Sequence, residues 1–134
     1  MTKKEAALRQ INAAIQHFEL KEYECAITLA GAAEGQMEGA EGSRHLFEEL
    51  KVRVPPEFKN ENEWVSWLNS TRDWLKHETP QLGDEWEIND YEAAIMILRA
   101  VTKFQWTYKQ GTKQMEIFLE HWRKGEYSPP SAKH

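Results

Sequence analysis

Arg72 and His77 are the residues of this chain whose types and spacing could carry chemistry. They are the first and last residues of the hexapeptide RDWLKH, residues 72–77, in which a polar residue, Asp73, directly follows the arginine. An arginine stays cationic and binds phosphate oxygens through its planar guanidinium group. A histidine can transfer a proton near neutral pH. The hexapeptide therefore predicts a phosphate-handling site.

The helix that carries this hexapeptide must bring the two side chains together. Asn60 and Glu63 have the spacing of a capping box at its start. Pro80 must end it, because the residue before a proline avoids helical geometry. On a straight helix, positions five apart diverge by about 140°. Arg72 and His77 converge only if the helix loosens before Pro80, or if a second copy faces the first in a dimer. The alternative is an arginine at the edge of the core and a histidine that caps the last carbonyls.

The rest of the chain also has helical patterns, with apolar residues three or four positions apart and no alternating pattern of a strand. Helices are expected at about residues 2–20, 22–37, 43–50, 60–78, 89–110 and 112–124, with Gly111 and Gly125 as the stops of the last two. We predict one all-α domain over residues 1–125, an antiparallel up-and-down bundle of five to six helices. Residues 126–134 should form a flexible C-terminal tail.

Three glycines recur every four residues in the second predicted helix. They are Gly31, Gly35 and Gly39. Each glycine in a helix costs about 1 kcal/mol relative to alanine. We therefore expect a neighbouring backbone to pack closely against this face.

Composition limits the class of protein. With 134 residues, 40% hydrophobic and 29% charged, the chain has the size and balance of one soluble globular domain. No apolar run approaches the roughly 20 residues of a membrane span. Cys25 is the single cysteine, so no internal disulfide forms, which fits the cytoplasm. The chain has no His-x3-His, no Glu-x2-His and no second cysteine, and carboxylates at helical spacing such as Glu116 and Glu120 are expected to be surface charge. We expect no metal and no cofactor.

Charge is unevenly distributed along the chain. The net charge of −5 argues against a protein whose whole surface binds nucleic acid. Two interpretations of a basic segment stay open, a local anion-facing surface and a solvated helix face. The tryptophans of the fourth predicted helix similarly fit core or dimer packing, or base stacking if exposed. The basic residues are Arg99, Lys103, Lys109, Lys113, Arg123 and Lys124, and the tryptophans are Trp64, Trp67 and Trp74.

Two short stretches resemble known helical proteins. RDWLKH is similar to the R-(N/D/H)-x3-H signature of the HEPN superfamily, the higher eukaryote and prokaryote nucleotide-binding domains. CAITLAGAAEGQM (residues 25–37), followed by WLKHE (residues 74–78), resembles small bacterial helical proteins with a TLAxAA-like helix and a later RNFFKH-like helix end. The resemblance covers roughly residues 8–110 in the order of the helices.

The resemblance implies an up-and-down helical bundle, usually a homodimer with its motifs near the subunit interface. In nuclease members it implies metal-independent RNA cleavage, with Arg72 and His77 at the two motif positions. His77 would transfer the proton of a ribose 2′-hydroxyl or of the leaving oxygen, Arg72 would stabilise the phosphate charge, and Asp73 would orient one of them. Asp73 stands where asparagine is commoner, which places a carboxylate near the phosphate. Many members are not catalytic.

Two functions remain open at this point. The first is a module that acts on RNA or a nucleotide, as a ribonuclease in a toxin or phage-defence setting with an antitoxin-like protein partner. The second is a non-enzymatic helical homodimer or partner-binding protein. Convergence of Arg72 and His77 in an open, shared cleft supports the first. Burial of Arg72 against a core carboxylate, with His77 alone in solvent, supports the second.

Overall fold

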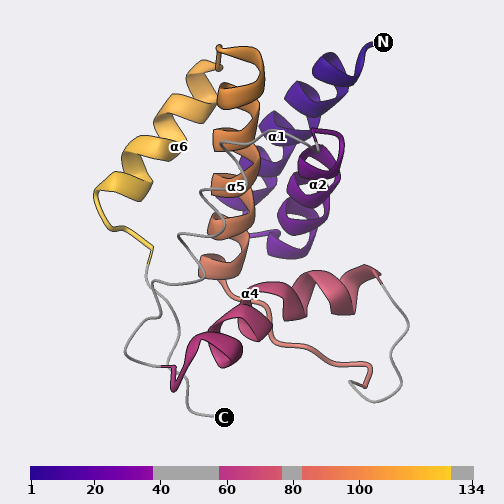
Figure 1. Cartoon of the computed structure of the whole chain (residues 1–134), viewed down its shortest axis with the longest axis vertical. Coiled ribbons are helices and arrows are strands. Elements are labelled where there is room, and N and C mark those ends of the chain that lie inside the picture. The colour runs from indigo at the N-terminus through magenta and orange to yellow at the C-terminus, as the bar shows by residue number, and fades with distance from the viewer. Residues whose placement is uncertain (38–57, 77–82, 128–134) are drawn as a thin grey trace.

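The structure, a computed structural model, describes residues 1–37, 58–76 and 83–127. These ranges hold five α-helices and no strand, which confirms the all-α prediction (Figure 1). The helix expected at residues 43–50 lies outside them. The helices are α1 (Lys3–Glu19), α2 (Tyr23–Gly35), α4 (Glu61–Lys76), α5 (Asp90–Tyr108) and α6 (Lys113–Arg123).

α5 is the central helix of the described part of the chain. It contacts each of the other four helices, and α1 and α2 pack extensively against each other. Figure 1 shows α1, α2, α5 and α6 side by side, whereas α4 lies across one end of this group. The helix that carries Arg72 therefore faces the lower turns of α2 and α5. No helix in the described ranges is long and apolar enough to cross a membrane.

Side-chain caps set the starts of four helices, as their sequences predict. In each case a side-chain oxygen three residues upstream accepts the hydrogen bond of an N–H in the first turn, which has no partner inside the helix. The pairs are Glu5 N–H to Thr2 at 3.0 Å, Glu63 N–H to Asn60 at 2.9 Å, Glu92 N–H to Asn89 at 3.0 Å and Met115 N–H to Thr112 at 3.2 Å.

The end of α5 differs from the prediction. Lys109, and not Gly111, adopts the left-handed conformation, with φ 55°, and its N–H donates to the Gln105 carbonyl at 2.9 Å. A Cβ on Gly111 would lie 2.9 Å from Nε2 of Gln105, so the flexible end of that side chain would have to move. Gly125, with φ 70°, follows α6 as predicted.

Two apolar clusters hold the helices together. The larger one lies between α1, α2, α5 and α6 and includes Ile11, Ile27 and Ile97. The smaller one joins α4 to the start of α5 through Phe58, Trp64, Tyr91 and Ile95. Trp64 is 1% exposed. Its ring stacks on that of Trp67, with 5.4 Å between centroids. These two tryptophans therefore pack within the structure, as helical spacing predicts.

Candidate anion site

The structure describes two of the three predicted site residues, Arg72 and Asp73. Arg72 is half-buried on α4, and the neighbouring Asp73 is exposed to solvent. His77 lies outside the described residues, so its convergence with Arg72 stays a prediction. Among the described residues, the neighbours of the Arg72 side chain come from α2 and α5.

Arg72 lines a pocket bounded by three helices. Its volume is about 410 Å³. α2 supplies one wall, α4 contributes Arg72 and Leu75, and α5 contributes Lys103. The residues of the α2 wall are Ile27, Thr28, Gly31, Ala32, Glu34 and Gly35.

Two of the three regularly spaced glycines form part of this wall, and the third, Gly39, lies outside the described residues. No described backbone makes the expected close approach to either glycine. A Cβ on Gly31 would lie 3.6 Å from Cε of Met96 and 3.7 Å from Cδ of Arg72, which are side-chain atoms at ordinary contact distance. A Cβ on Gly35 would meet no atom of another described residue within 4 Å. The absent side chains therefore leave room for the Arg72 stem and for the pocket itself.

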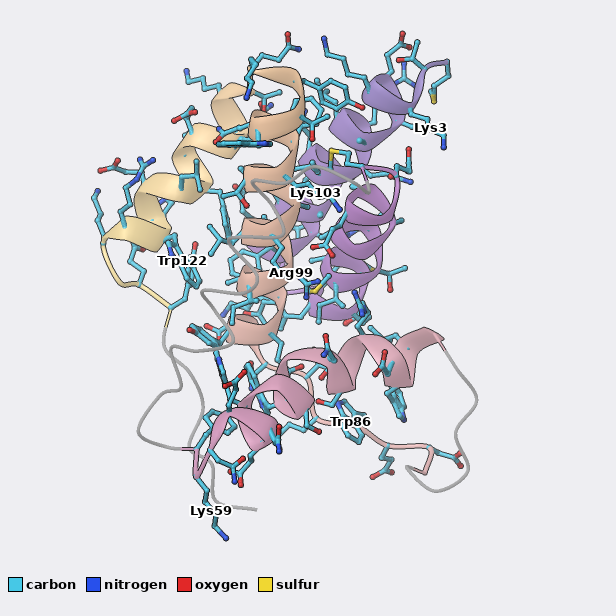
Figure 2. The ribbon with its side chains drawn as sticks, in the orientation of Figure 1. Lys3, Lys59, Trp86, Arg99, Lys103 and Trp122 are labelled. Atoms are coloured by element: carbon cyan, nitrogen blue, oxygen red, sulfur yellow. The ribbon has the colours of Figure 1, made fainter. Side chains whose placement is uncertain are left out.

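Lys103 and Arg99 bring positive charge to the same place from α5. Four residues apart, they share a helix face, and Figure 2 shows both on the side of α5 that adjoins α2. They are 9% and 7% exposed, respectively. The predicted basic segment is thus divided, because Lys109, Lys113, Arg123 and Lys124 are exposed to solvent while these two are buried.

Arg99 forms an ion pair across the helix interface. Its Nη2 donates to Oε1 of Glu34 at 2.7 Å, and the two side chains are 8% and 15% exposed. Burial lowers the pKa of the Arg99 guanidinium group, the Glu34 carboxylate raises it, and the positive charge of Arg72 lowers it. The guanidinium groups of Arg72 and Arg99 are therefore close enough to repel each other.

Arg72 and Lys103 have no such counterion within residues 1–37, 58–76 and 83–127. No described residue forms an ion pair with either of them. Nε of Arg72 is buried and has no hydrogen-bond partner in the described part of the chain. Among the described residues of the pocket wall, Glu34 is the one carboxylate, and Arg99 already binds it. Buried charges are normally paired, so the described part of this arrangement is suited to bind an anion.

A polar network next to Arg72 fixes the position of α4. The Thr71 hydroxyl donates to the Glu92 carboxylate of α5, and Nε1 of Trp86 donates to the Thr71 oxygen at 2.8 Å. Nε1 of Trp74 donates to the Gly83 carbonyl at 3.1 Å. Contacts on both sides of Arg72 therefore hold the segment before α5 against α4.

The carboxyl group of Glu92 in this network has a raised pKa. Burial raises its pKa from 4.5 to about 7, the hydrogen bond from Thr71 lowers it, and the negative charge of Glu87 raises it. The sequence gives Glu92 only its place in the first turn of a helix, because Thr71 is distant along the chain. Within the described ranges, no cluster of three or more His, Cys, Asp or Glu side chains could hold a metal ion.

Comparison of the chain with models of protein families, with curated proteins and with solved structures finds no match. The arrangement itself can bind an anion, since two cationic side chains line a pocket whose carboxylate is already paired.

Proposed function

We propose that this chain is a HEPN-like helical domain that binds phosphate groups of RNA or of a nucleotide in the pocket between α2, α4 and α5. One observation carries the proposal. Lys103, 9% exposed, and Arg72 line the pocket without an ion-pair partner among the described residues. A phosphate would supply the missing negative charge, and guanidinium and ammonium groups are its usual ligands.

The proposal extends to cleavage through the remaining residues of the motif. His77 follows Arg72 by five positions. It would transfer a proton to or from a ribose oxygen while Arg72 stabilises charge on the phosphate. Asp73 would orient one of these side chains. An antiparallel bundle that forms a homodimer would bring the His77 of one copy toward the Arg72 of the other.

The setting that we propose is a bacterial toxin or phage-defence system in the cytoplasm. An antitoxin-like protein would then bind the domain and restrain it. The single cysteine, Cys25, fits a reducing compartment.

Binding of single-stranded RNA tests the first part of the proposal. Fluorescence anisotropy of a labelled oligonucleotide should show binding that Lys103→Gln or Arg72→Gln weakens at least tenfold, about 1.4 kcal/mol. Lys113→Gln is the matched control, because Lys113 is exposed on α6. Equal binding by all four proteins would contradict a role for the pocket.

Cleavage is tested separately. Purified protein should cleave single-stranded RNA in EDTA, and His77→Ala should abolish this activity while RNA binding persists. Sedimentation analysis of the same samples gives the oligomeric state. Undiminished cleavage by His77→Ala would remove the ribonuclease part of the proposal and leave binding as the function.

A further inference from the structure

We infer that the pocket receives a terminal phosphate monoester and not an internal phosphodiester of a nucleic-acid strand. This inference rests on the proposed function and names the chemical class of its ligand. Three properties support it: the net charge of the pocket, the limited exposure of Lys103 and the volume of the pocket.

The charge of the site matches a dianion. Among the described residues, Glu34 on the pocket wall is neutralised by Arg99 behind it, so Arg72 and Lys103 leave a net charge of +2. A phosphate monoester carries about −1.5 to −2 at pH 7, because its second pKa is about 6. An internal phosphodiester carries one negative charge, so it would leave one cation of the site without compensation. A buried charge without compensation is strongly disfavoured.

The limited exposure of Lys103 also favours a terminal phosphate monoester. The side chain is 9% exposed and lies on the wall of the pocket between three helices. A phosphate that uses Lys103 as a ligand of this pocket would enter between the three helices. The phosphate at the end of a molecule has one substituent and can enter with that substituent directed outward. A phosphate within a strand has two substituents and must carry both into the pocket.

The volume and the other lining residues of the pocket fit a small group, such as a sugar or a base, attached to the phosphate. A volume of about 410 Å³ is near the lower limit of small-ligand pockets, which span about 300–1,000 Å³. The Thr28 hydroxyl could donate to a phosphate oxygen, while Ile27 and Leu75 offer apolar surface to a sugar or base. Gly31 and Gly35 add no side chain to this wall.

Matched ligands test the inference on the unaltered protein. Isothermal titration calorimetry would compare adenylyl-adenosine, which has only an internal phosphodiester, with the same dinucleotide bearing a 5′-phosphate. The phosphorylated form should bind at least tenfold more tightly. Adenosine 5′-monophosphate should bind, and its affinity should fall several-fold from pH 7.5 to pH 5.5 as the monoester loses its second charge. Adenylyl-adenosine, whose charge is constant over this range, is the control for changes in the protein.

Further ligands identify the source of the monoester. Ribose 5-phosphate binding as tightly as adenosine 5′-monophosphate would support recognition of the phosphate without the base. Tighter binding of the nucleotide would support a nucleotide or a phosphorylated RNA end. Lys103→Met should abolish the preference for the phosphorylated dinucleotide, and Lys113→Met should keep it.

Two failures are distinguishable. Equal affinity of both dinucleotides would overturn the inference and leave the proposed binding of RNA intact. Binding of neither dinucleotide, of neither monoester and of no longer RNA would overturn the proposed function as well.

Discussion

Lys103 shows how one residue could serve binding at the expense of stability. The residue is only 9% exposed on α5, and no described residue forms an ion pair with its ammonium group. Arg72 faces the same pocket with a buried Nε that has no hydrogen-bond partner there. Buried charges without partners destabilise a fold. Residues at binding sites often have this cost.

We expect Lys103→Met to stabilise the protein in phosphate-free buffer. Methionine keeps the length of the side chain and removes the buried charge, so the free energy of unfolding should rise by about 1 kcal/mol. Urea unfolding followed by circular dichroism measures this change. The exposed Lys113→Met is the control and should stay within about 0.5 kcal/mol of the parent. A less stable Lys103→Met protein would mean that a counterion is present.

Glu92 predicts a dependence of stability on pH. Its pKa is raised from 4.5 to about 7 in the folded protein. Between these values the folded state keeps a proton that the unfolded state has lost, so stability falls as pH rises. Above pH 7 the full cost, on the order of 3 kcal/mol, is present. Below pH 4.5 both states are protonated and the cost is absent.

Glu92→Gln should therefore stabilise the protein at pH 8 and have little effect at pH 4.5. The glutamine oxygen can still accept the hydrogen bond of Thr71. Thermal unfolding of both proteins across this range measures the difference. Glu85→Gln, at an exposed position before α5, is the matched control. A constant difference between Glu92→Gln and the parent at all pH values would contradict the raised pKa.

At the scale of helices, α2 depends on glycine for space and not for backbone conformation. Gly31 would accept a Cβ at 3.6 Å from Met96 and 3.7 Å from Arg72. Gly31→Ala should then raise the free energy of unfolding by up to about 1 kcal/mol through helix propensity. Gly125→Ala makes the same change at φ 70° and should cost about 1 kcal/mol. Denaturant unfolding of the two variants gives the comparison, and destabilisation by Gly31→Ala would indicate a tighter interface.

Helix starts could be predicted from the sequence because caps are local. Asn60, Asn89 and Thr112 each bind an N–H three residues ahead, a spacing visible in the chain. The end of α5 could not be predicted in the same way. Glycine at position 111 was the better candidate for a left-handed residue by conformational energy alone. The side chain of Gln105, which approaches that glycine, depends on how the turn folds.

The predicted helical pattern, with apolar residues three or four positions apart, also underestimated the burial of α5. We expected one apolar face, whereas the side chains from Tyr91 to Val101 are buried on all sides. The sequence carries a signal for this, since few charged residues interrupt that segment. Arg99 was therefore better interpreted as a buried cation than as part of a solvated face. Its partner Glu34 comes from α2 and follows from no spacing in the sequence.

In the whole molecule, the feature that could not be predicted from the sequence is the angle at which α4 crosses the other helices. The motif predicted Arg72 as an anion ligand, and the structure places it in a pocket. Lys103 joins it only because α4 lies across the end of the other helices (Figure 1). The repeating patterns of single helices contain no information about this angle.

Trp64 anchors this arrangement, and its removal should loosen α4 before the rest. Trp64→Ala should destabilise the protein by about 3–5 kcal/mol, the usual cost of truncating a buried tryptophan. Native-state hydrogen exchange should show faster exchange in α4 than in α1, since the two helices belong to different apolar clusters. Trp106→Ala is the control, because Trp106 is 53% exposed. Equal acceleration in both helices would mean that the two clusters unfold as one unit.

An anion between α4 and α5 would act as a noncovalent cross-link between distant parts of the chain. Ligands that bind only the folded state add to its stability in proportion to the logarithm of their concentration. Proteases act on opened states, so a protein with this pocket would be degraded more slowly when its ligand is abundant. Its lifetime in a cell would then report the supply of that anion.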